Sequence, residues 1–472
     1  MKTIKSLLLG SAAAIVAIAS AQAADLPVKA KAVEYVKVCS LYGAGFYYIP
    51  GTDTCLKVGG FVRADYYVNN VQGSGFTTVG VYNRATNYYA TRARAAVTLD
   101  ARSQTSYGTL RSYAQFGINS NGSGLTTSAY IQLAYIQFAG FTFGNAVSFF
   151  DIYGWDQLHM NHRSWTNGAS GSQGVNLLAY TASFGNGVSA SISLEDPNPR
   201  RPGVFGSNGV ALTLVNSTKG VNFPDVIANL RVDQSWGYAQ LSGALHDASG
   251  TWFGPAGAGV FAPTGRSVGD SLGYAIAAGG FFKIPGTAGD TFGIQGTYSK
   301  GAAGYVTSLA GYNIGRNSVQ TFGITNDAVF SNAAIAGTGV TAGSVELTEV
   351  WGVELGYEHV WMAGLKTSLA GGYTQVNFNA NATNIICTAA LAAAGCNPDH
   401  SFYQIGSRTT WTPVQNLDIA LDVVYSHFNG MSYAPTQVGN IGGNVGAAAT
   451  NAGLGSAGIW SGMLRVQRNF WK

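Results

Sequence analysis

Four arginines recur in neighbouring stretches of the chain, at spacings that could let their guanidinium groups act together on dissolved ions. They are Arg63, Arg92, Arg94 and Arg111. Cations along a narrow water column act strongly on passing ions, because the surrounding wall has a low dielectric constant. Two carboxylates farther along, Asp151 and Asp156, could oppose them and create a transverse field. This combination predicts electrostatic selection of small polar solutes, with no bond made or broken.

Ordinary ion pairing is a second interpretation of the same arginines. Asp65 and Asp100 lie in the same stretches and, at alternating spacing, on the same face. Lys57 and Arg102 share that face nearer to one end of their stretches. The sequence leaves both interpretations open. It also leaves open which residues around Asp151 face inward, because loops have no periodicity.

Motifs for catalysis or metal binding are weak. His159 and His162 stand three residues apart, but in an expected loop that lacks the helix needed to bring their imidazoles together. No G-x-S-x-G nucleophile motif occurs. The G-x-G-x-x-G at residues 453–458 precedes an expected strand rather than a helix, so we interpret it as a loop tip. We therefore expect no catalytic residue, no metal site, no cofactor and no enzymatic activity.

Apolar and polar residues alternate with a period of two along most of the chain, which is typical of β-strands. Between Leu56 and Val68 the even-numbered positions are apolar or glycine, apart from tyrosine, whereas the odd-numbered positions include Lys57, Arg63 and Asp65. Short turns and long spacers rich in Gly, Ser and Asn separate successive stretches in alternation. Sixteen strands are expected, at about 56–69, 88–102, 108–118, 128–138, 141–149, 175–184, 188–195, 224–233, 237–246, 271–282, 291–300, 348–360, 365–376, 401–412, 417–428 and 458–470.

The composition decides which face of these strands meets water. Only 10% of the residues are charged, whereas an ordinary soluble domain carries about 25%, so charge is too scarce to coat a water-facing exterior. An apolar exterior requires lipid, where a sheet must close on itself to satisfy its backbone. We expect an all-β fold, a sixteen-stranded antiparallel transmembrane β-barrel with short turns at one rim and long loops at the other. Such a barrel is too wide for wall side chains to fill, which predicts an aqueous channel.

The first residues have the pattern of a secretory signal peptide. Lys2 and Lys5 precede a short apolar stretch and an A-x-A site at residues 21–23. We expect residues 1–23 to be removed after export and residues 24–472 to form the barrel domain. Removal of the two lysines takes the formal charge from +4 to +2. A chain so close to neutral argues against a nucleic-acid partner.

The four cysteines fall into two local couples, Cys39 with Cys55 and Cys387 with Cys396. In an oxidising compartment such couples form disulfides by default, each worth about 2–3 kcal/mol. Neither couple has C-x-x-C spacing or neighbouring histidines, which weakens a metal interpretation. We expect one disulfide within each couple.

Several stretches resemble a known family. They are VCSLYGAGF at residues 38–46, IPGTDTC at 49–55, VGGFVR at 58–63 and YIQFAGFTFG at 135–144. Together they resemble the alphaproteobacterial porin family of Brucella and rhizobial outer membranes, most strongly over residues 38–156. The SFFD segment at residues 148–151 is similar to the start of that family's constriction loop.

The resemblance implies a homotrimeric general porin whose third long loop folds inward and narrows the pore. It implies a passive channel for small hydrophilic solutes and ions in the bacterial outer membrane, in contact with membrane lipid and lipopolysaccharide. It also implies a C-terminal aromatic residue, where this chain has Lys472 after Phe470 and Trp471. A substrate-specific channel, and a barrel that serves as an anchor or adhesin through its long loops, are the alternatives.

Overall fold

The fold is described from a computed structural model. It describes residues 37–68, 89–122, 126–152, 166, 168, 170, 173–207, 212–216, 218–253, 266–309, 311–316, 319–331, 334–388, 396–431, 453–454 and 456–471. Residues Cys39–Lys472 form one compact unit, to which everything below refers.

Sixteen long strands dominate the described residues, and each pairs antiparallel with its neighbours in chain order. The strands are β2 (Cys55–Val68), β3 (Tyr89–Thr105), β4 (Gly108–Asn121), β5 (Thr126–Phe138), β6 (Phe141–Ala146), β7 (Val175–Gly185), β8 (Val188–Glu195), β11 (Asp225–Gln234), β12 (Gly237–Asp247), β15 (Leu272–Lys283), β16 (Thr291–Lys300), β21 (Glu349–Met362), β22 (Leu365–Asn377), β23 (His400–Val414), β24 (Leu417–Asn429) and β26 (Ser456–Trp471). Each corresponds to one of the strands predicted from the sequence.

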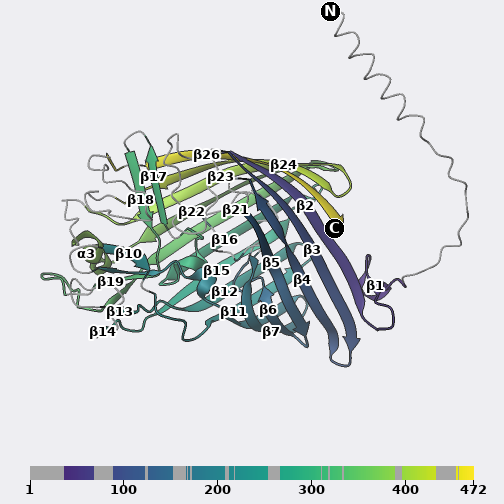
Figure 1. Cartoon of the computed structure of the whole chain (residues 1–472), viewed down its shortest axis with the longest axis horizontal. Helices are drawn as coiled ribbons and strands as arrows, with labels where there is room; N and C mark the ends of the chain where they lie inside the picture. The colour runs from purple at the N-terminus through teal and green to yellow at the C-terminus, as the bar shows by residue number, and fades with distance from the viewer. Residues whose placement is uncertain are drawn as a thin grey trace, which may run out of the picture. The chain divides into compact units, whose positions relative to one another are not determined.

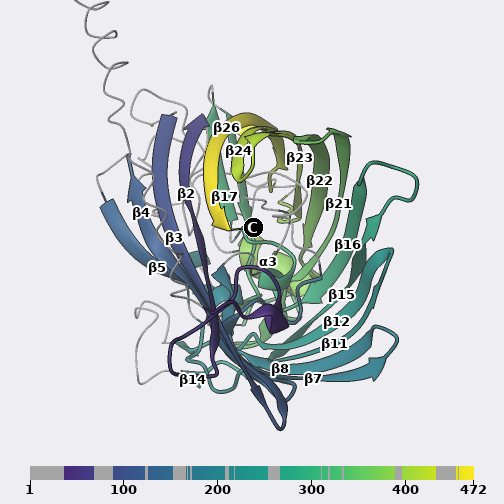
Figure 2. The same ribbon diagram turned by 90° about the vertical axis from the view of Figure 1, so that its right-hand side faces the viewer.

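The sheet closes because its last strand pairs with its first. β26 runs antiparallel to β2, with Val62 opposite Arg468 and Val68 opposite Gly462. The strands therefore surround an interior, as Figures 1 and 2 show from the side and from one end. Closure leaves none of these strands with a free edge, which is what lipid demands of a sheet. The predicted barrel is confirmed.

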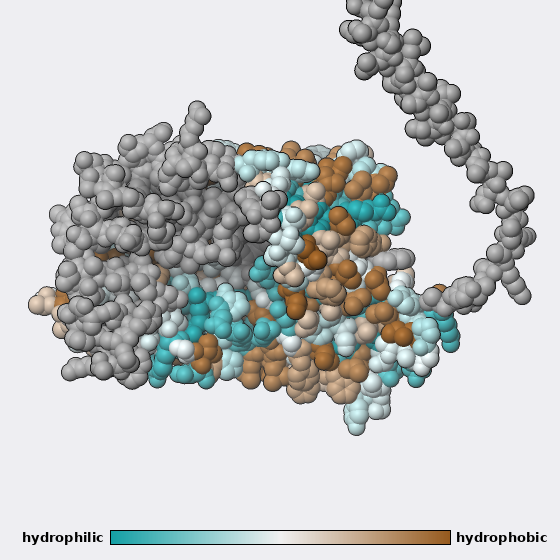
Figure 3. All heavy atoms as spheres, viewed as in Figure 1, coloured by the Kyte–Doolittle hydropathy of each residue, from teal (hydrophilic) through white to brown (hydrophobic). Residues whose placement is uncertain are grey.

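Side chains alternate between an exposed apolar face and a more buried polar face. On β2, Val62, Tyr66 and Val68 are exposed, whereas Asp65 and Tyr67 are buried. Because successive side chains of a strand point to opposite sides, the exposed set faces outward and the polar set faces the interior. Figure 3 shows hydrophobic side chains gathered over the outer surface of the barrel. Among the described residues, no helix combines the length and hydropathy needed to cross a membrane.

Short turns connect the strands at one end of the barrel, called here the turn side. Ala139 and Gly140 between β5 and β6, and Asn186 and Gly187 between β7 and β8, all have positive φ. Two successive residues with positive φ form the type I′ turn, whose twist matches that of the flanking strands. The described ends of the long connections therefore lie at the other end of the barrel, the loop side.

The long loops carry short elements that the strand pattern did not predict. A parallel pairing of β9 with β19 and another of β18 with β25 join loops that are far apart in sequence. Both sheets lie at the loop side in Figure 1. The short elements are η1 (Ser40–Tyr42), β1 (Tyr47–Tyr48), η3 (Asn198–Arg200), β9 (Val204–Ser207), β10 (Leu212–Asn216), β13 (Trp252–Phe253), β14 (Arg266–Ser267), η4 (Ala303–Tyr305), β17 (Gly311–Arg316), β18 (Val319–Ile324), β19 (Ala328–Ser331), β20 (Val345–Leu347), α3 (Ala380–Thr388) and β25 (Gly453–Leu454).

Both predicted disulfides are present. Cys39 is bonded to Cys55 on the turn side, at the start of β2, and Cys387 is bonded to Cys396 in the loop that follows β22. The bonds therefore constrain opposite ends of the barrel.

Candidate functional site

The third long loop leaves the wall after β6 and immediately binds the inner face of the barrel. The Phe149 N–H donates to Glu195 Oε1 at 2.9 Å. Its carbonyl accepts from Asn229 Nδ2 at 2.7 Å and from Gln240 Nε2 at 3.2 Å. Phe150, the next residue, is 1% exposed. The root of the loop is thus fixed to β8, β11 and β12 from inside.

Farther along, the loop reaches a distant part of the wall. Thr166 is buried and lies so close to Gly372 on β22 that no Cβ would fit there. Gly168 lies equally close to the backbone of Tyr305 in η4. β6 and β22 are far apart in the strand order of the closed sheet. The loop therefore crosses the interior, and the inward fold implied by the resemblance is confirmed.

Asp151 lies in a buried ion pair within this loop. Arg200 in η3 donates from Nη2 to Asp151 Oδ1 at 2.5 Å, and both side chains are more than nine-tenths buried. The Ser170 N–H and hydroxyl donate to Asp151 Oδ2 at 2.7 and 2.6 Å. The Arg200 guanidinium also lies 4.4 Å from the centre of the Tyr305 ring. These contacts tie the third loop to two other long loops.

A polar chain continues from Tyr305 to the wall. The Tyr305 hydroxyl donates to Asp225 Oδ2 at 2.6 Å, and Asp225 also binds His246 Nδ1 at 2.8 Å. His246 Nε2 lies 3.5 Å from Asp327 Oδ2, whose other oxygen accepts from the Ala303 N–H. Burial and the Asp225 carboxylate raise the pKa of Tyr305 well above its ordinary value, so its hydroxyl stays a donor. The loop segments that carry Tyr305 and Asp327 are thereby fixed to β11 and β12.

The predicted basic residues on β2 and β3 lie side by side on the inner wall. Arg63 is directly opposite Arg94 in the strand register. Arg63 Nε donates to Gln467 at 2.7 Å, and Arg94 Nε donates to Asn119 at 2.6 Å. Arg92 is paired with Asp65 at 2.6 Å. The structure thus brings three of the four predicted arginines together.

Carboxylates on this wall are shared between guanidiniums. Asp65 also pairs with Arg465 of β26 at 2.6 Å. Asp100 pairs with both Arg102 and Arg111, at 2.7 and 3.0 Å. The ion pairing considered as an alternative is therefore present, but each carboxylate serves two cations. This part of the wall keeps a positive excess.

Of the two predicted loop carboxylates, Asp151 is buried against Arg200, and Asp156 lies outside the described residues. The described carboxylate beside the far end of the loop is instead Glu354 on β21, whose Cγ lies near Thr166 and Gly372. The inner wall therefore carries a basic side around β2 and β3 and a carboxylate where the third loop reaches β22.

Comparison with known proteins identifies the family. The model of the porin subfamily matches residues 25–462. The chain belongs to this porin family.

Two curated relatives are porins of Brucella. Porin Omp2b of Brucella suis biovar 1 is 36% identical over 249 residues, which cover 50% of this chain and 63% of that protein. Porin Omp2a of Brucella canis is 36% identical over 265 residues, covering 51% of this chain and 65% of that protein. Each alignment thus spans less than two thirds of the relative's length.

A solved structure supports the fold. The outer-membrane channel DcaP of Acinetobacter baumannii superposes with a TM-score of 0.57 at 15% identity, covering 90% of this chain and 99% of that one. Membership of the porin family makes this chain a protein of the bacterial outer membrane.

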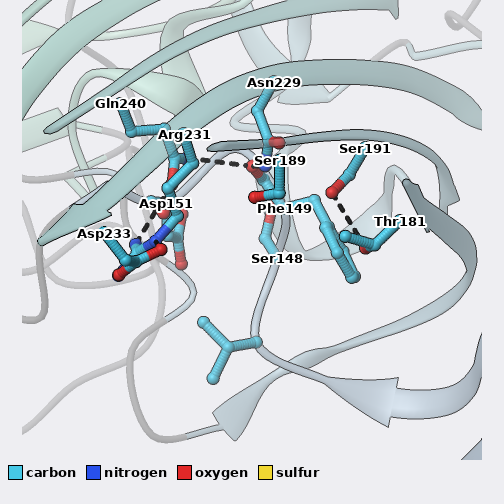
Figure 4. Close-up of a pocket in the computed structure, with 11 residues that line it drawn as sticks. Ser148, Phe149, Asp151, Thr181, Ser189, Ser191, Asn229, Arg231, Asp233 and Gln240 are labelled. Atoms are coloured by element: carbon cyan, nitrogen blue, oxygen red, sulfur yellow. Dashed lines mark hydrogen bonds and ion pairs between the residues drawn. The ribbon is translucent and has the colours of Figure 1, made fainter. Parts of the chain in front are cut away.

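In the porin, a polar pocket of about 350 Å³ opens between the root of the third loop and the strands β7, β8, β11 and β12 (Figure 4). Hydroxyl groups line one side, where Thr181 and Ser191 are hydrogen-bonded at 2.9 Å. On the other side, Arg231 donates twice to Asp233 at 2.8 Å. The pocket can offer donors and acceptors to a polar solute.

Several residues of the site were not singled out from the sequence. Arg465 has the inward parity of β26, so the same alternation that found Arg63 could have found it. Arg200, Tyr305 and Thr166 lie in loops, where no periodicity indicates which side chains face inward. Their roles follow from contacts between loops that only the fold reveals.

Proposed function

We propose that the porin is a passive diffusion channel for small hydrophilic solutes and ions across the outer membrane. The observation that carries this proposal is the third loop, which crosses the interior from β6 to β22. A sixteen-stranded barrel is wider than its wall side chains can fill, and an inward loop reduces this opening to a passage of solute size. Transport then requires no moving part and no energy source.

Within this proposal, the constriction lies between the third loop and the basic wall formed by Arg63, Arg92 and Arg94. The fourth predicted arginine, Arg111, lies opposite Arg102 nearer the turn side and pairs with Asp100. Asp151 positions the loop through its buried pair with Arg200. Asp156 remains a candidate to face the arginines. A field between opposed charges orients dipolar solutes and selects ions by sign.

Single-channel recording in planar bilayers tests the proposal. A diffusion channel gives discrete conductance steps that rise in proportion to salt concentration, with no saturation by any one solute. Absence of conductance in protein shown by circular dichroism to be folded would contradict a channel and favour the anchor or adhesin alternative.

A substrate-specific channel is the second candidate, and the hydroxyl-lined pocket beside the third loop favours it. A solute that dwells in this pocket would block ion current in a concentration-dependent, saturable way. Recording with neutral sugars, amino acids and small carboxylates added singly separates this candidate from general diffusion.

We further propose that the mature chain begins after residue 23 and assembles as a homotrimer. The broad apolar exterior supports contacts with lipid and with other copies (Figure 3). N-terminal sequencing of protein purified from outer membranes tests the first point. Chemical cross-linking in the same membranes tests the second.

A further inference from the structure

The segment before β2 folds against the inner wall at the turn side. Buried positions on β2 alternate through Cys55, Asp65 and Tyr67, so Cys55 belongs to the inward set. Its disulfide to Cys39 therefore holds the preceding residues on the interior side of the wall. Residues 39–55 are called the N-terminal hairpin below.

The hairpin has a small core of its own. Cys39, Phe46 and Cys55 are buried together, and Tyr42 and Tyr48 pack against them. The Cys39 N–H donates to the Phe46 carbonyl at 3.0 Å, and β1 pairs with the first residues of β2. Seen from the turn side, this purple segment lies in front of the barrel interior (Figure 2). The disulfide thus closes a compact element at the mouth of the barrel.

Two aromatic rings of the hairpin meet cations of the inner wall. The Arg102 guanidinium lies 4.9 Å from the Phe46 ring centre and 5.7 Å from that of Tyr42. The Lys57 ammonium lies 5.9 Å from the Phe46 ring centre. The negative face of an aromatic ring attracts such cations. The hairpin therefore holds Arg102 and Lys57 at the turn-side mouth.

The wall beside the hairpin carries more cations than carboxylates. Asp100 accepts from both Arg102 and Arg111, so its single carboxylate is shared. Lys57 lies opposite Asp100 in the strand register, so three cations of this part of the wall lie around one carboxylate. None of these contacts involves the third loop, whose described anchors lie on β8, β11, β12, β22, η3 and η4.

We propose that the N-terminal hairpin is a second selectivity element, at the turn-side mouth of the channel. Its disulfide keeps two rings packed on Arg102 and Lys57, which narrows the mouth and fixes positive charge there in favour of small anions. This inference rests on the proposed diffusion function and adds a filter distinct from the constriction at the third loop.

Selective opening of the two disulfides tests whether the Cys39–Cys55 bond holds the hairpin in the mouth of the channel. A water-soluble phosphine reduces a disulfide to two thiols and takes oxygen from water to become the phosphine oxide. Three proteins are compared in bilayers: wild type, Cys39→Ser with Cys55→Ser, and the control Cys387→Ser with Cys396→Ser. We expect the phosphine to raise single-channel conductance in wild type and in the control. The Cys39→Ser, Cys55→Ser channel should start at the higher conductance and not respond.

Substitution of the two cations at the mouth, with the Cys39–Cys55 disulfide intact, tests whether their charge contributes to ion selectivity. Lys57→Gln with Arg102→Gln should shift the reversal potential in a KCl gradient toward cation preference. Wild-type conductance unaffected by the phosphine, or a reversal potential unchanged by the double substitution, overturns the proposal. Absence of wild-type conductance overturns the proposed diffusion function instead, so the two failures are distinguishable.

Discussion

At the scale of single residues, the inner wall around β2 is arranged so that guanidiniums outnumber the carboxylates that pair with them. Asp65 lies between Arg92 and Arg465, and Arg63 and Arg94 bind amide oxygens of Gln467 and Asn119. Amide partners hold an arginine in place without cancelling its charge. The field at this wall therefore depends on the arginines themselves.

We expect neutralisation of three of them, Arg63→Gln, Arg92→Gln and Arg94→Gln together, to shift ion selectivity toward cations. The expected readout is the reversal potential of the channel in a KCl gradient. Arg468→Gln is the control, because Arg468 is an exposed arginine with the outward parity of Leu464 and Phe470. An equal shift in the control, or none in the triple variant, would contradict the basic wall.

A different residue, Asp290 in the turn between β15 and β16, gives a pH-dependent prediction. Hydrogen bonds from the Tyr357 hydroxyl, the Val360 N–H and His359 lower the pKa of Asp290 to about 2. Because the pKa of Asp290 is lower in the folded protein than its unfolded value of 3.8, the ionised carboxylate contributes its full stabilisation at pH values above 3.8. This contribution is lost as the pH falls through about 2. Asp290→Asn should therefore destabilise the barrel near neutral pH and converge with wild type in strong acid. Urea unfolding across this range measures the difference, and a pH-independent difference would contradict the assignment.

At the scale of elements, the strands could be predicted and the contacts between loops could not. The alternation of Val62, Arg63 and their neighbours indicates which face of β2 meets lipid. The same alternation makes each strand of the barrel predictable from the sequence. Loop residues have no such constraint. The pair of Asp151 with Arg200 joins segments 49 residues apart, and neither side chain signals its partner in the sequence. The inward fold of the third loop accordingly follows from the family resemblance and not from a sequence pattern.

We expect Arg200→Met to loosen the third loop. The substitution leaves the Asp151 carboxylate buried without its cation, and breaking such a pair costs about 3–5 kcal/mol. Displacement of the loop avoids that cost by exposing Asp151 to water. Single-channel recordings should show larger and noisier conductance than wild type.

Arg201→Met is the matched control for that variant. Arg201 is also buried and pairs with Asp247 at 3.5 Å, but its described hydrogen bonds go to Lys219 and Asp247 rather than to the third loop. Its conductance should stay close to that of wild type. If both variants showed the same rise in conductance, the cause would be general destabilisation of the loops and not loss of the Asp151–Arg200 pair.

At the scale of the whole molecule, the low content of charged residues and the closed sheet both meet the requirements of a lipid environment. A closed barrel satisfies its backbone internally, so its outer surface needs no polar groups and can be apolar over its whole circumference. Water is confined to the interior, where the charged side chains of β2, β3 and β21 gather. An exposed outer residue should therefore behave as one buried in lipid.

Neighbouring residues of β8 provide the comparison. Ile192 is 55% exposed on the outer face, whereas Ser191 lines the interior pocket. In a water-soluble protein, arginine at a position as exposed as Ile192 would cost little. In a membrane barrel, Ile192→Arg should destabilise by about 2–4 kcal/mol if the site lies near the bilayer midplane, whereas Ser191→Arg should cost less because its guanidinium can reach water. Urea unfolding in lipid vesicles measures both, and an equal or reversed order would show that the apolar face of β8 does not meet lipid.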